Sequence, residues 1–285
     1  MIISKIGIMG AGTMGAGIAQ IAAQAGYQVI LNDIELSFVD KALSRMEASL
    51  SKSVEKGRMT EEQKQGILGQ VTKSADLSDF SAVDLAIEVI VEDLELKKKA
   101  FSQLESICKP EAYLASNTSS MPITILGNAT KRPERVVGMH FFNPPPVMKL
   151  VEIIRGYYTS DETVKLASEV AQKMGKTTVE VKRDVPGFIV NRLMMAQYIE
   201  AIRLLEEGVA TIEDIDKATK LGLNHPMGAF ELHDFAGIDI GYYVAEYFYE
   251  EFGDVRWNPP QMLKALMRSG RLGRKTDAGW YSYKK

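Results

Sequence analysis

The chain has 285 residues and a mass of 31.6 kDa, enough for about two domains with cores of their own. Hydrophobic residues make up 46% and charged residues 25%, which are ordinary values for a folded globular protein and disfavour disordered and membrane classes. Lysine and arginine number 34 against 37 acidic residues, a net charge of -3. We therefore expect no nucleic acid or membrane partner, and any anionic ligand must be held by local chemistry.

Cysteine and histidine are scarce. The single cysteine, Cys108, has no partner for an intrachain disulfide, and three histidines form no cluster with zinc spacing. We expect no metal site. Near the start, Gly7 and Gly10 interrupt the chain before an apolar signal segment can form. These features favour a reducing, cytoplasmic location.

Two patterns of secondary structure divide the chain. The first 180 residues alternate short β-branched runs with amphipathic helical stretches, which predicts an α/β domain of Rossmann type with a mostly parallel sheet. From Pro186-Gly187 onward the pattern is helical only, which predicts an all-α domain. We place the domains at residues 1–184 and 185–285. Strands are expected over 5–9, 27–32, 85–91, 112–116, 135–140, 150–154 and 177–181, and helices over 36–56, 94–108, 162–174, 188–207, 212–221 and 238–252.

Two helices of the second domain carry apolar residues around much of their circumference. This surplus exceeds what one small core needs, so it predicts packing against the first domain or another subunit. The residues concerned are Met194, Met195, Tyr242, Tyr243, Tyr247 and Phe248.

A glycine-rich motif, Gly10-Ala11-Gly12-Thr13-Met14-Gly15, follows the first predicted strand and opens a helix. In a dinucleotide site the first glycine allows a tight turn, the second lets the backbone approach a pyrophosphate, and the third permits close helix packing. The next strand ends in Asp33, 18 residues beyond Gly15, where a carboxylate can accept the ribose hydroxyls. The same charge repels a 2′-phosphate, and no arginine lies in residues 34–37, so NAD is favoured over NADP. FAD stays open, as does a plain turn with Asp33 capping the next helix.

A histidine and a glutamate point to proton transfer. His140 ends a predicted strand, and ligands of open parallel sheets sit at the carboxyl ends of strands. An imidazole can take the proton of an alcohol as hydride departs. Glu152 lies in an apolar strand, where a carboxylate needs a partner, and can orient the His140 ring. The alternative is a structural histidine.

Two polar positions complete the candidates. Residues 116–120 follow another predicted strand and precede Pro122, so one serine is expected to cap a helix while the others face the cleft. Asn191 lies on the first helix of the second domain, where its carboxamide can reach a substrate carbonyl. Capping alone remains the alternative for the serines.

Six motifs occur in order over the whole chain, at residues 10–15, 92–97, 116–120, 140–144, 186–192 and 221–227. On these motifs the chain resembles the L-3-hydroxyacyl-CoA dehydrogenase family, and most of all its bacterial members acting on 3-hydroxybutyryl-CoA. The resemblance implies NAD-dependent interconversion of an L-3-hydroxyacyl-CoA with its 3-ketoacyl-CoA by a homodimer. Two alternatives remain: a dehydrogenase of a free hydroxy acid or sugar acid, and a non-catalytic NAD sensor.

The resemblance also implies roles for single residues. His140 is the acid and base, Glu152 orients it, and Ser119 and Asn191 contact the substrate oxygens. Residues expected around the cofactor are Glu92, Lys97, Ser119, Asn143 and Lys275, with Ser119 and Asn143 also close to the substrate. For coenzyme A the matching residues are Ser49 and Lys56, which stand nearly two helical turns apart and so share one helix face about 10 Å apart.

Overall fold

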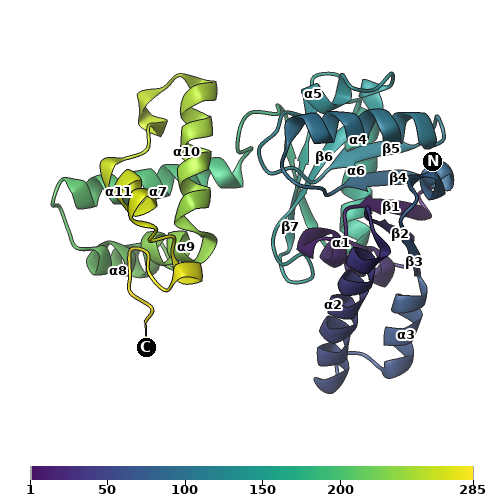
Figure 1. The fold of residues 1–285 in the computed structure, drawn as a ribbon, viewed down its shortest axis with the longest axis horizontal. Helices are drawn as coiled ribbons and strands as arrows, with labels where there is room; N and C mark the ends of the chain where they lie inside the picture. Colours follow the sequence, from purple (N-terminus) through teal and green to yellow (C-terminus); the bar gives the residue numbers. More distant parts are fainter. Residues whose placement is uncertain (1, 285) are drawn as a thin grey trace. The chain divides into compact units, whose positions relative to one another are not determined.

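The chain forms two compact units, Met1–Phe188 and Ile189–Lys285, and the computed structural model describes residues 2–284 (Figure 1). The first unit combines a sheet with helices, and the elements of the second are helical. The α/β class with a helical second part is therefore confirmed. No helix within residues 2–284 is long and apolar enough to span a membrane.

An eight-stranded sheet organises the first unit. In spatial order its strands are β3 (Val71–Ser74), β2 (Gln28–Asn32), β1 (Lys5–Met9), β4 (Leu85–Glu88), β5 (Tyr113–Ser116), β6 (Val136–Phe141), β7 (Leu150–Ile154) and β8 (Thr177–Val181). All neighbours run parallel except β6 and β7, because the loop of residues 142–149 between them is too short for a crossover helix. The sheet changes direction of winding at β1, which lies between β2 and β4, and such switch points hold ligands.

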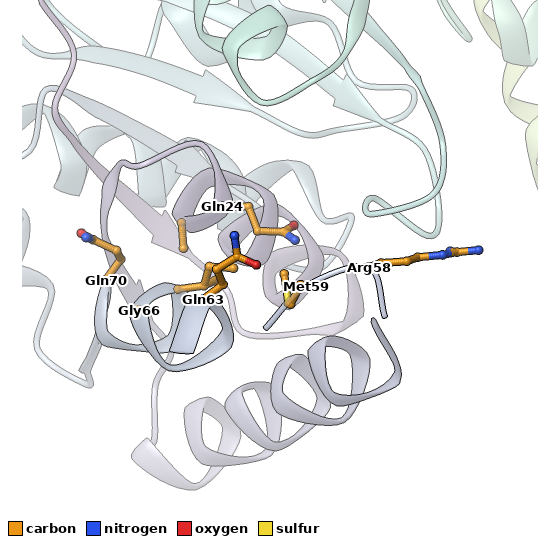
Figure 2. Close-up of a pocket in the computed structure, with 8 residues that line it drawn as sticks. Gln24, Arg58, Met59, Gln63, Gly66 and Gln70 are labelled. Carbon is orange, nitrogen blue, oxygen red and sulfur yellow. The ribbon is translucent and has the colours of Figure 1, made fainter. Parts of the chain in front are cut away.

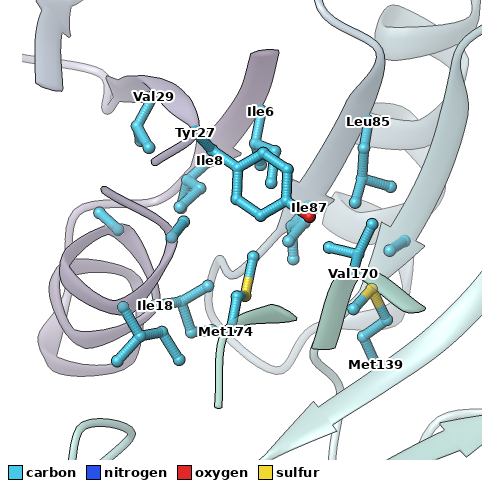
Figure 3. Packing of buried hydrophobic residues seen from close by; sticks show 14 of the residues in the cluster. Ile6, Ile8, Ile18, Tyr27, Val29, Leu85, Ile87, Met139, Val170 and Met174 are labelled. Atoms are coloured by element: carbon cyan, nitrogen blue, oxygen red, sulfur yellow. The ribbon is translucent and has the colours of Figure 1, made fainter. Parts of the chain in front are cut away.

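Helices cover both faces of this sheet. One buried cluster joins the sheet to α1, α2 and α6, and Figure 3 shows part of it, including Ile6 and Ile8 of β1 and Ile18 of α1. A second cluster joins the other face to α4 and α5. The helices are α1 (Thr13–Gln24), α2 (Leu36–Glu55), α3 (Glu61–Gly69), α4 (Leu94–Ile107), α5 (Ile123–Gly127) and α6 (Asp161–Lys173), with short 3-10 helices at Leu77–Ala82 and Pro133–Arg135.

Strand β3 and helix α3 were not predicted. The strand is short and lies at the sheet edge, where Thr72 and Lys73 are exposed, so it lacks the apolar alternation of a buried strand. Helix α3 begins at a capping box, in which the Thr60 hydroxyl accepts from the Gln63 N–H and the Gln63 side chain accepts from the Thr60 N–H.

The second unit contains α7 (Val190–Glu206), α8 (Ile212–Gly222), α9 (Ala229–Ala236), α10 (Ile238–Phe252) and α11 (Gln261–Ser269), with 3-10 helices at Val255–Trp257 and Arg274–Thr276. The short α9 and α11 were not predicted. The prediction that a helix begins at Phe188 was wrong. This residue has a left-handed backbone (φ 49°) after Gly187 and is buried in the core of the first unit. A helix cannot run through that conformation, so α7 starts at Val190.

The apolar surplus of the second unit is smaller than its sequence indicated. Met195 and Phe248 are completely buried in the unit's own core and are not spare surface, so that part of the expectation was wrong. Tyr243 is 61% exposed, and Leu193 and Leu221 are exposed by 68% and 80%. Tyr243 was in the predicted set, but Leu193 of α7 and Leu221 of α8 were not, so the exposed apolar surface lies partly on other side chains than those predicted.

Candidate active site

The turn between β1 and α1 requires its glycines. Gly10 has φ 113°, and a Cβ at Gly15 would lie 1.8 Å from the Gly10 carbonyl oxygen. At Gly12 a Cβ would project into open space, which leaves room for a ligand to approach the backbone. Gly12 is also the N-cap of α1, so no side chain caps the first amides of that helix. The turn therefore fits a pyrophosphate.

Asp33 closes this turn from the end of β2. Its Oδ2 accepts from the Ala11 N–H at 2.7 Å, and its Oδ1 accepts from the Ile34 N–H at 2.8 Å. The N-cap of α2 is Glu35, so the alternative in which Asp33 caps that helix is wrong. A cavity of about 470 Å³ beside Asp33 is lined by Gly10, Gly12, Asn32, Ile34, Val89, Ile90, Val91 and Leu96, with others from α4. An apolar slot beside a carboxylate suits an adenine and its ribose, so these residues fit NAD.

Two cations on α2 also reach this region, and the sequence argument did not count them. A cavity of about 320 Å³ is lined by Asp33, Lys41 and Arg45 together with Ala11, Gly12, Ile34 and Phe38. Arg45 donates from Nη2 to the Ala11 carbonyl at 2.8 Å. Asp33 and Arg45 therefore hold the two ends of the same residue. Arg45 lies several turns along α2 from Asp33. The helical repeat is the sequence signal that could have placed its side chain at this cavity.

His140 and Glu152 form a buried pair. The Nδ1 atom of His140 lies 2.7 Å from Oε2 of Glu152, and the two residues are 5% and 0% exposed. A carboxylate accepts, so Nδ1 carries the proton of this bond and Nε2 of the neutral ring is left as a proton acceptor. The rings of Phe142 and Phe188 lie 4.5 and 5.7 Å from the imidazole and exclude water around it.

The loop after β5 is held by Glu92. Its Oε1 accepts from Thr118 Oγ1 at 2.5 Å, from the Ser119 N–H at 2.9 Å and from Ser119 Oγ at 3.3 Å. Burial favours the neutral carboxyl, but the Lys97 charge and these hydrogen bonds outweigh it and lower the pKa of Glu92. The expected serine cap was wrong: α5 has Pro122 as its N-cap, and the loop hydroxyls turn to Glu92 instead.

Sequence reasoning missed Asn117 and Glu88. Asn117 Oδ1 accepts from the Phe141 N–H at 2.9 Å and so ties the end of β5 to the strand that carries His140. Glu88 is fully buried at the end of β4 and pairs with Lys97, which is only 1% exposed. The signal for Glu88 was the one used for Glu152, a carboxylate at the end of an apolar strand.

The loop between β6 and β7 carries Asn143, which is exposed and precedes Pro144 through a cis peptide bond. Lys176 anchors this loop, because its Nζ donates to the carbonyls of Pro145 at 2.5 Å and Met148 at 2.8 Å. Burial lowers the pKa of this lysine. The loop is thereby fixed next to His140.

The two residues expected at coenzyme A lie along α2. Ser49 is half-buried and lines a cavity of about 130 Å³ with Arg45 and Pro144, Pro145 and Pro146. Lys56 is exposed and is the C-cap of the helix. The Ser49 end of this helix face therefore meets the loop that follows His140.

Asn191 and Lys275 belong to the second unit. Asn191 is the second residue of α7, and Lys275 lies in a 3-10 helix near the chain end. Lys275 Nζ lies 2.6 Å from both carboxylate oxygens of Asp239. Asp239, at the start of α10, was not singled out in the sequence.

A further groove, shown in Figure 2, has a volume of about 450 Å³ and is lined by residues other than the predicted site residues. They are Ala23, Gln24, Arg58, Met59, Gln63, Gly66, Ile67 and Gln70. Within residues 2–284 no group of three acidic, histidine or cysteine residues is arranged to hold a metal ion.

Comparison with known proteins shows the family of the chain. The model of the 3-hydroxyacyl-CoA dehydrogenase NAD-binding domain matches residues 5–185, and that of the family's C-terminal domain matches residues 187–283. The chain belongs to the 3-hydroxyacyl-CoA dehydrogenase family.

Similar proteins cover the whole chain. A probable 3-hydroxybutyryl-CoA dehydrogenase of Deinococcus radiodurans is 47% identical over 98% of this chain and 100% of its own length. A 3-hydroxybutyryl-CoA dehydrogenase of Bradyrhizobium diazoefficiens is 44% identical over 99% of this chain and 96% of its own. The crystal structure of (S)-3-hydroxybutyryl-CoA dehydrogenase from Ralstonia eutropha superposes with a TM-score of 0.97 at 42% identity, covering all of both chains.

Three predictions from the sequence are thereby confirmed. The protein is an oxidoreductase of the 3-hydroxyacyl-CoA dehydrogenase family, it has the family's NAD-binding domain, and its cofactor is NAD. The alternative of an NAD sensor without catalysis is set aside.

Proposed function

We propose that the protein interconverts L-3-hydroxybutyryl-CoA and acetoacetyl-CoA with NAD in the cytoplasm. The main support for this function is the buried His140–Glu152 pair, which lies at the same edge of the sheet as the glycine turn after β1. The carboxyl ends of β1, β4, β5 and the parallel strand β6 meet at that edge.

Separate residues of the chain transfer the proton, orient the imidazole and bind the substrate. Bound NAD supplies the hydride acceptor for the alcohol carbon. His140 Nε2 takes the hydroxyl proton, and Glu152 holds the ring and stabilises its cation. In the reverse direction the protonated ring returns that proton to the carbonyl oxygen. Ser119 and Asn191 donate hydrogen bonds to the substrate oxygens, and Asn143 borders both ligands.

The remaining site residues bind the ends of the two ligands. Gly10 to Gly15 and Asp33 hold the pyrophosphate and the adenosine ribose, and Lys275 contacts the cofactor from the second unit. Ser49 and Lys56 hold coenzyme A along α2. Support for this route is the shared cavity of Ser49 with Pro144 to Pro146, which leads toward the His140 loop.

The experiment is NADH oxidation with acetoacetyl-CoA, with free acetoacetate and longer 3-ketoacyl-CoAs in parallel. We expect turnover with acetoacetyl-CoA and little with free acetoacetate. Turnover restricted to a free keto acid would favour the hydroxy-acid alternative and refute the proposed substrate. The longer substrates then measure the acyl-chain preference.

A homodimer formed through residues 185–285 is part of the proposal. Its support is the exposed apolar set on the helices of the second unit, which includes Leu193, Leu221 and Tyr243. Sedimentation equilibrium at micromolar concentration should give a dimer. Leu221→Glu and Tyr243→Glu should shift it to monomer, and a monomeric parent protein would contradict the proposal.

The cytoplasmic part has one support in the chain. The sequence has a single cysteine, Cys108, which has no partner for an intrachain disulfide, and proteins of oxidising compartments commonly carry disulfides. A reporter fusion should fractionate with cytoplasmic marker enzymes.

A further inference from the structure

Gln20 is a buried polar side chain of α1 that lines a cavity. It is only 4% exposed, and the cavity of about 130 Å³ is the one that Arg45 and Ser49 of α2 also line. Within residues 2–284 the Gln20 carboxamide makes no hydrogen bond. Buried polar groups of proteins are nearly always hydrogen-bonded, so a carboxamide that the fold does not satisfy calls for a ligand.

The proline wall of this cavity is held in place from two sides. A Cβ at Gly17 would lie 2.8 Å from the ring of Pro145, so only a glycine lets α1 approach this proline so closely. Lys176 Nζ donates to the Pro145 carbonyl at 2.5 Å and to the Met148 carbonyl at 2.8 Å. Gln20 lies three residues after Gly17 on the same face of α1. The carboxamide therefore stands beside a fixed apolar wall.

The chemistry of the cavity fits a short, neutral part of a longer molecule. Its volume is below the roughly 300 to 1,000 Å³ of pockets that take a whole drug-sized ligand. A carboxamide donates from Nε2 and accepts at Oε1 without carrying a charge, and an amide group of a ligand matches both functions. Proline rings offer apolar surface to methylene groups. The pantetheine arm of coenzyme A has this composition, because its amides are separated by pairs of methylene groups.

We propose that Gln20 is a further substrate-binding residue, whose carboxamide exchanges two hydrogen bonds with one amide of the pantetheine arm. The inference rests on the proposed function in one respect, the use of coenzyme A thioesters. It goes beyond that function in assigning a residue of α1 to the arm and in predicting which part of coenzyme A responds when the carboxamide is removed.

The test replaces the carboxamide by an apolar side chain. Gln20→Leu breaks no hydrogen bond within residues 2–284, so its unfolding temperature should equal or exceed that of the parent. Gln20→Met, which is unbranched, is the second variant. The matched control is Gln24→Leu, the same change one turn further along α1, where the side chain is exposed and lines the groove of Figure 2. This control should behave as the parent.

Two pairs of ligands separate the arm from the nucleotide. In Gln20→Leu we expect kcat/KM to fall about tenfold for acetoacetyl-CoA, mainly through KM, and by the same factor for acetoacetyl-pantetheine, because both contain the arm. The affinity for coenzyme A, measured by calorimetry, should fall about as much. The affinity for adenosine 3′,5′-bisphosphate, which lacks the arm, should stay within twofold of the parent, as should that for NADH.

Three results would overturn the inference. Parent values of kcat/KM in a folded Gln20→Leu would show that the substrate does not use the carboxamide. A lower unfolding temperature with parent kinetics in both variants would make Gln20 a structural residue. A loss for acetoacetyl-CoA that acetoacetyl-pantetheine does not share would assign Gln20 to the nucleotide. A parent enzyme that neither binds coenzyme A nor reduces acetoacetyl-CoA would refute the proposed function itself, which the variants of an active parent leave intact.

Discussion

His140 and Glu152 stand directly opposite each other on the antiparallel strands β6 and β7, and their side chains meet at 2.7 Å. Opposite residues of an antiparallel pair project to the same face, so strand register alone brings ring and carboxylate together. The flanking pair Met139 and Ile153 is completely buried and prevents a register slip, which would carry both side chains to the other face. The pair proposed for catalysis is therefore set on the sheet and does not depend on a loop.

Replacing His140 by glutamine should lower kcat by about 10²- to 10⁴-fold, because no other side chain at this position can take the substrate proton. NADH binding should be retained, since the cavity proposed for the adenosine is lined by other residues. Stopped-flow turnover and NADH fluorescence titration measure the two effects. A kcat close to that of the parent would remove His140 from the mechanism.

Glu152→Gln keeps the shape of the side chain and removes its charge. We expect kcat to fall about 10- to 100-fold, because the amide holds the ring less firmly and does not stabilise the imidazolium. The pH–rate profile should shift as well. Glu180→Gln on the adjacent β8 is the control, because that carboxylate is exposed and pairs with Arg155. An unchanged profile in the Glu152 variant would show that the pair serves the fold only.

Site residues could be predicted from the sequence where a charged residue stood among apolar neighbours. Glu152 among aliphatic neighbours required a partner, and His140 at a strand end supplied it. Glu88 carried the same signal and was missed, because its partner Lys97 lies on a helix and looks like one of several lysines in that segment.

Helices and strands could be predicted from the sequence where the alternation of apolar and polar residues was regular. Strands β1, β7 and β8 and helix α10 have the predicted bounds, because each is framed by glycine, proline or polar turns. The edge strand β3 has one buried residue and so no pattern to detect. At Phe188 the local apolar run favoured a helix, but Gly187 and burial in the first unit imposed a left-handed backbone.

His233 makes the stability of the second unit depend on pH. It is 1% exposed, its ring stacks on Tyr198 at 4.4 Å, and burial lowers its pKa from 6.5 to about 4. Between pH 6.5 and pH 4 this histidine is protonated in the unfolded chain but stays neutral in the folded unit. The contribution of His233 to the free energy of unfolding is therefore fully present above pH 6.5 and decreases as the pH falls to 4. The total loss is on the order of 3 kcal/mol.

His233→Gln tests this dependence. Glutamine does not titrate and can still accept the Trp280 Nε1–H, which His233 Nδ1 accepts at 3.3 Å. Both tryptophans, Trp257 and Trp280, lie in the second unit, so their fluorescence reports its unfolding. The urea midpoint of the parent should drop between pH 6.5 and 4 by more than that of the variant. Equal drops would assign the pH dependence to other groups.

The last prediction concerns the choice of cofactor at Asp33. Its carboxylate, which already accepts from Ala11, should also accept from the adenosine ribose, and charge-assisted bonds of this kind contribute roughly 1.5 to 3 kcal/mol. NADPH loses these bonds and sets a phosphate against the carboxylate. We expect kcat/KM to favour NADH about a hundredfold, equivalent to about 2.7 kcal/mol. Asp33→Ser/Ile34→Arg should shrink or reverse the preference.

Arg45 and Lys41 sharpen the test, because both line the cavity beside Asp33 and attract the extra phosphate of NADPH. Lys41→Ala should therefore lower kcat/KM for NADPH while that for NADH stays unchanged, which widens the preference. Arg45 also holds the Ala11 carbonyl, so its replacement by alanine should weaken both cofactors. Affinities for ADP and 2′,5′-ADP measured by calorimetry isolate the phosphate from the chemistry. Equal kcat/KM for NADH and NADPH in the parent enzyme would show that Asp33 does not meet the ribose.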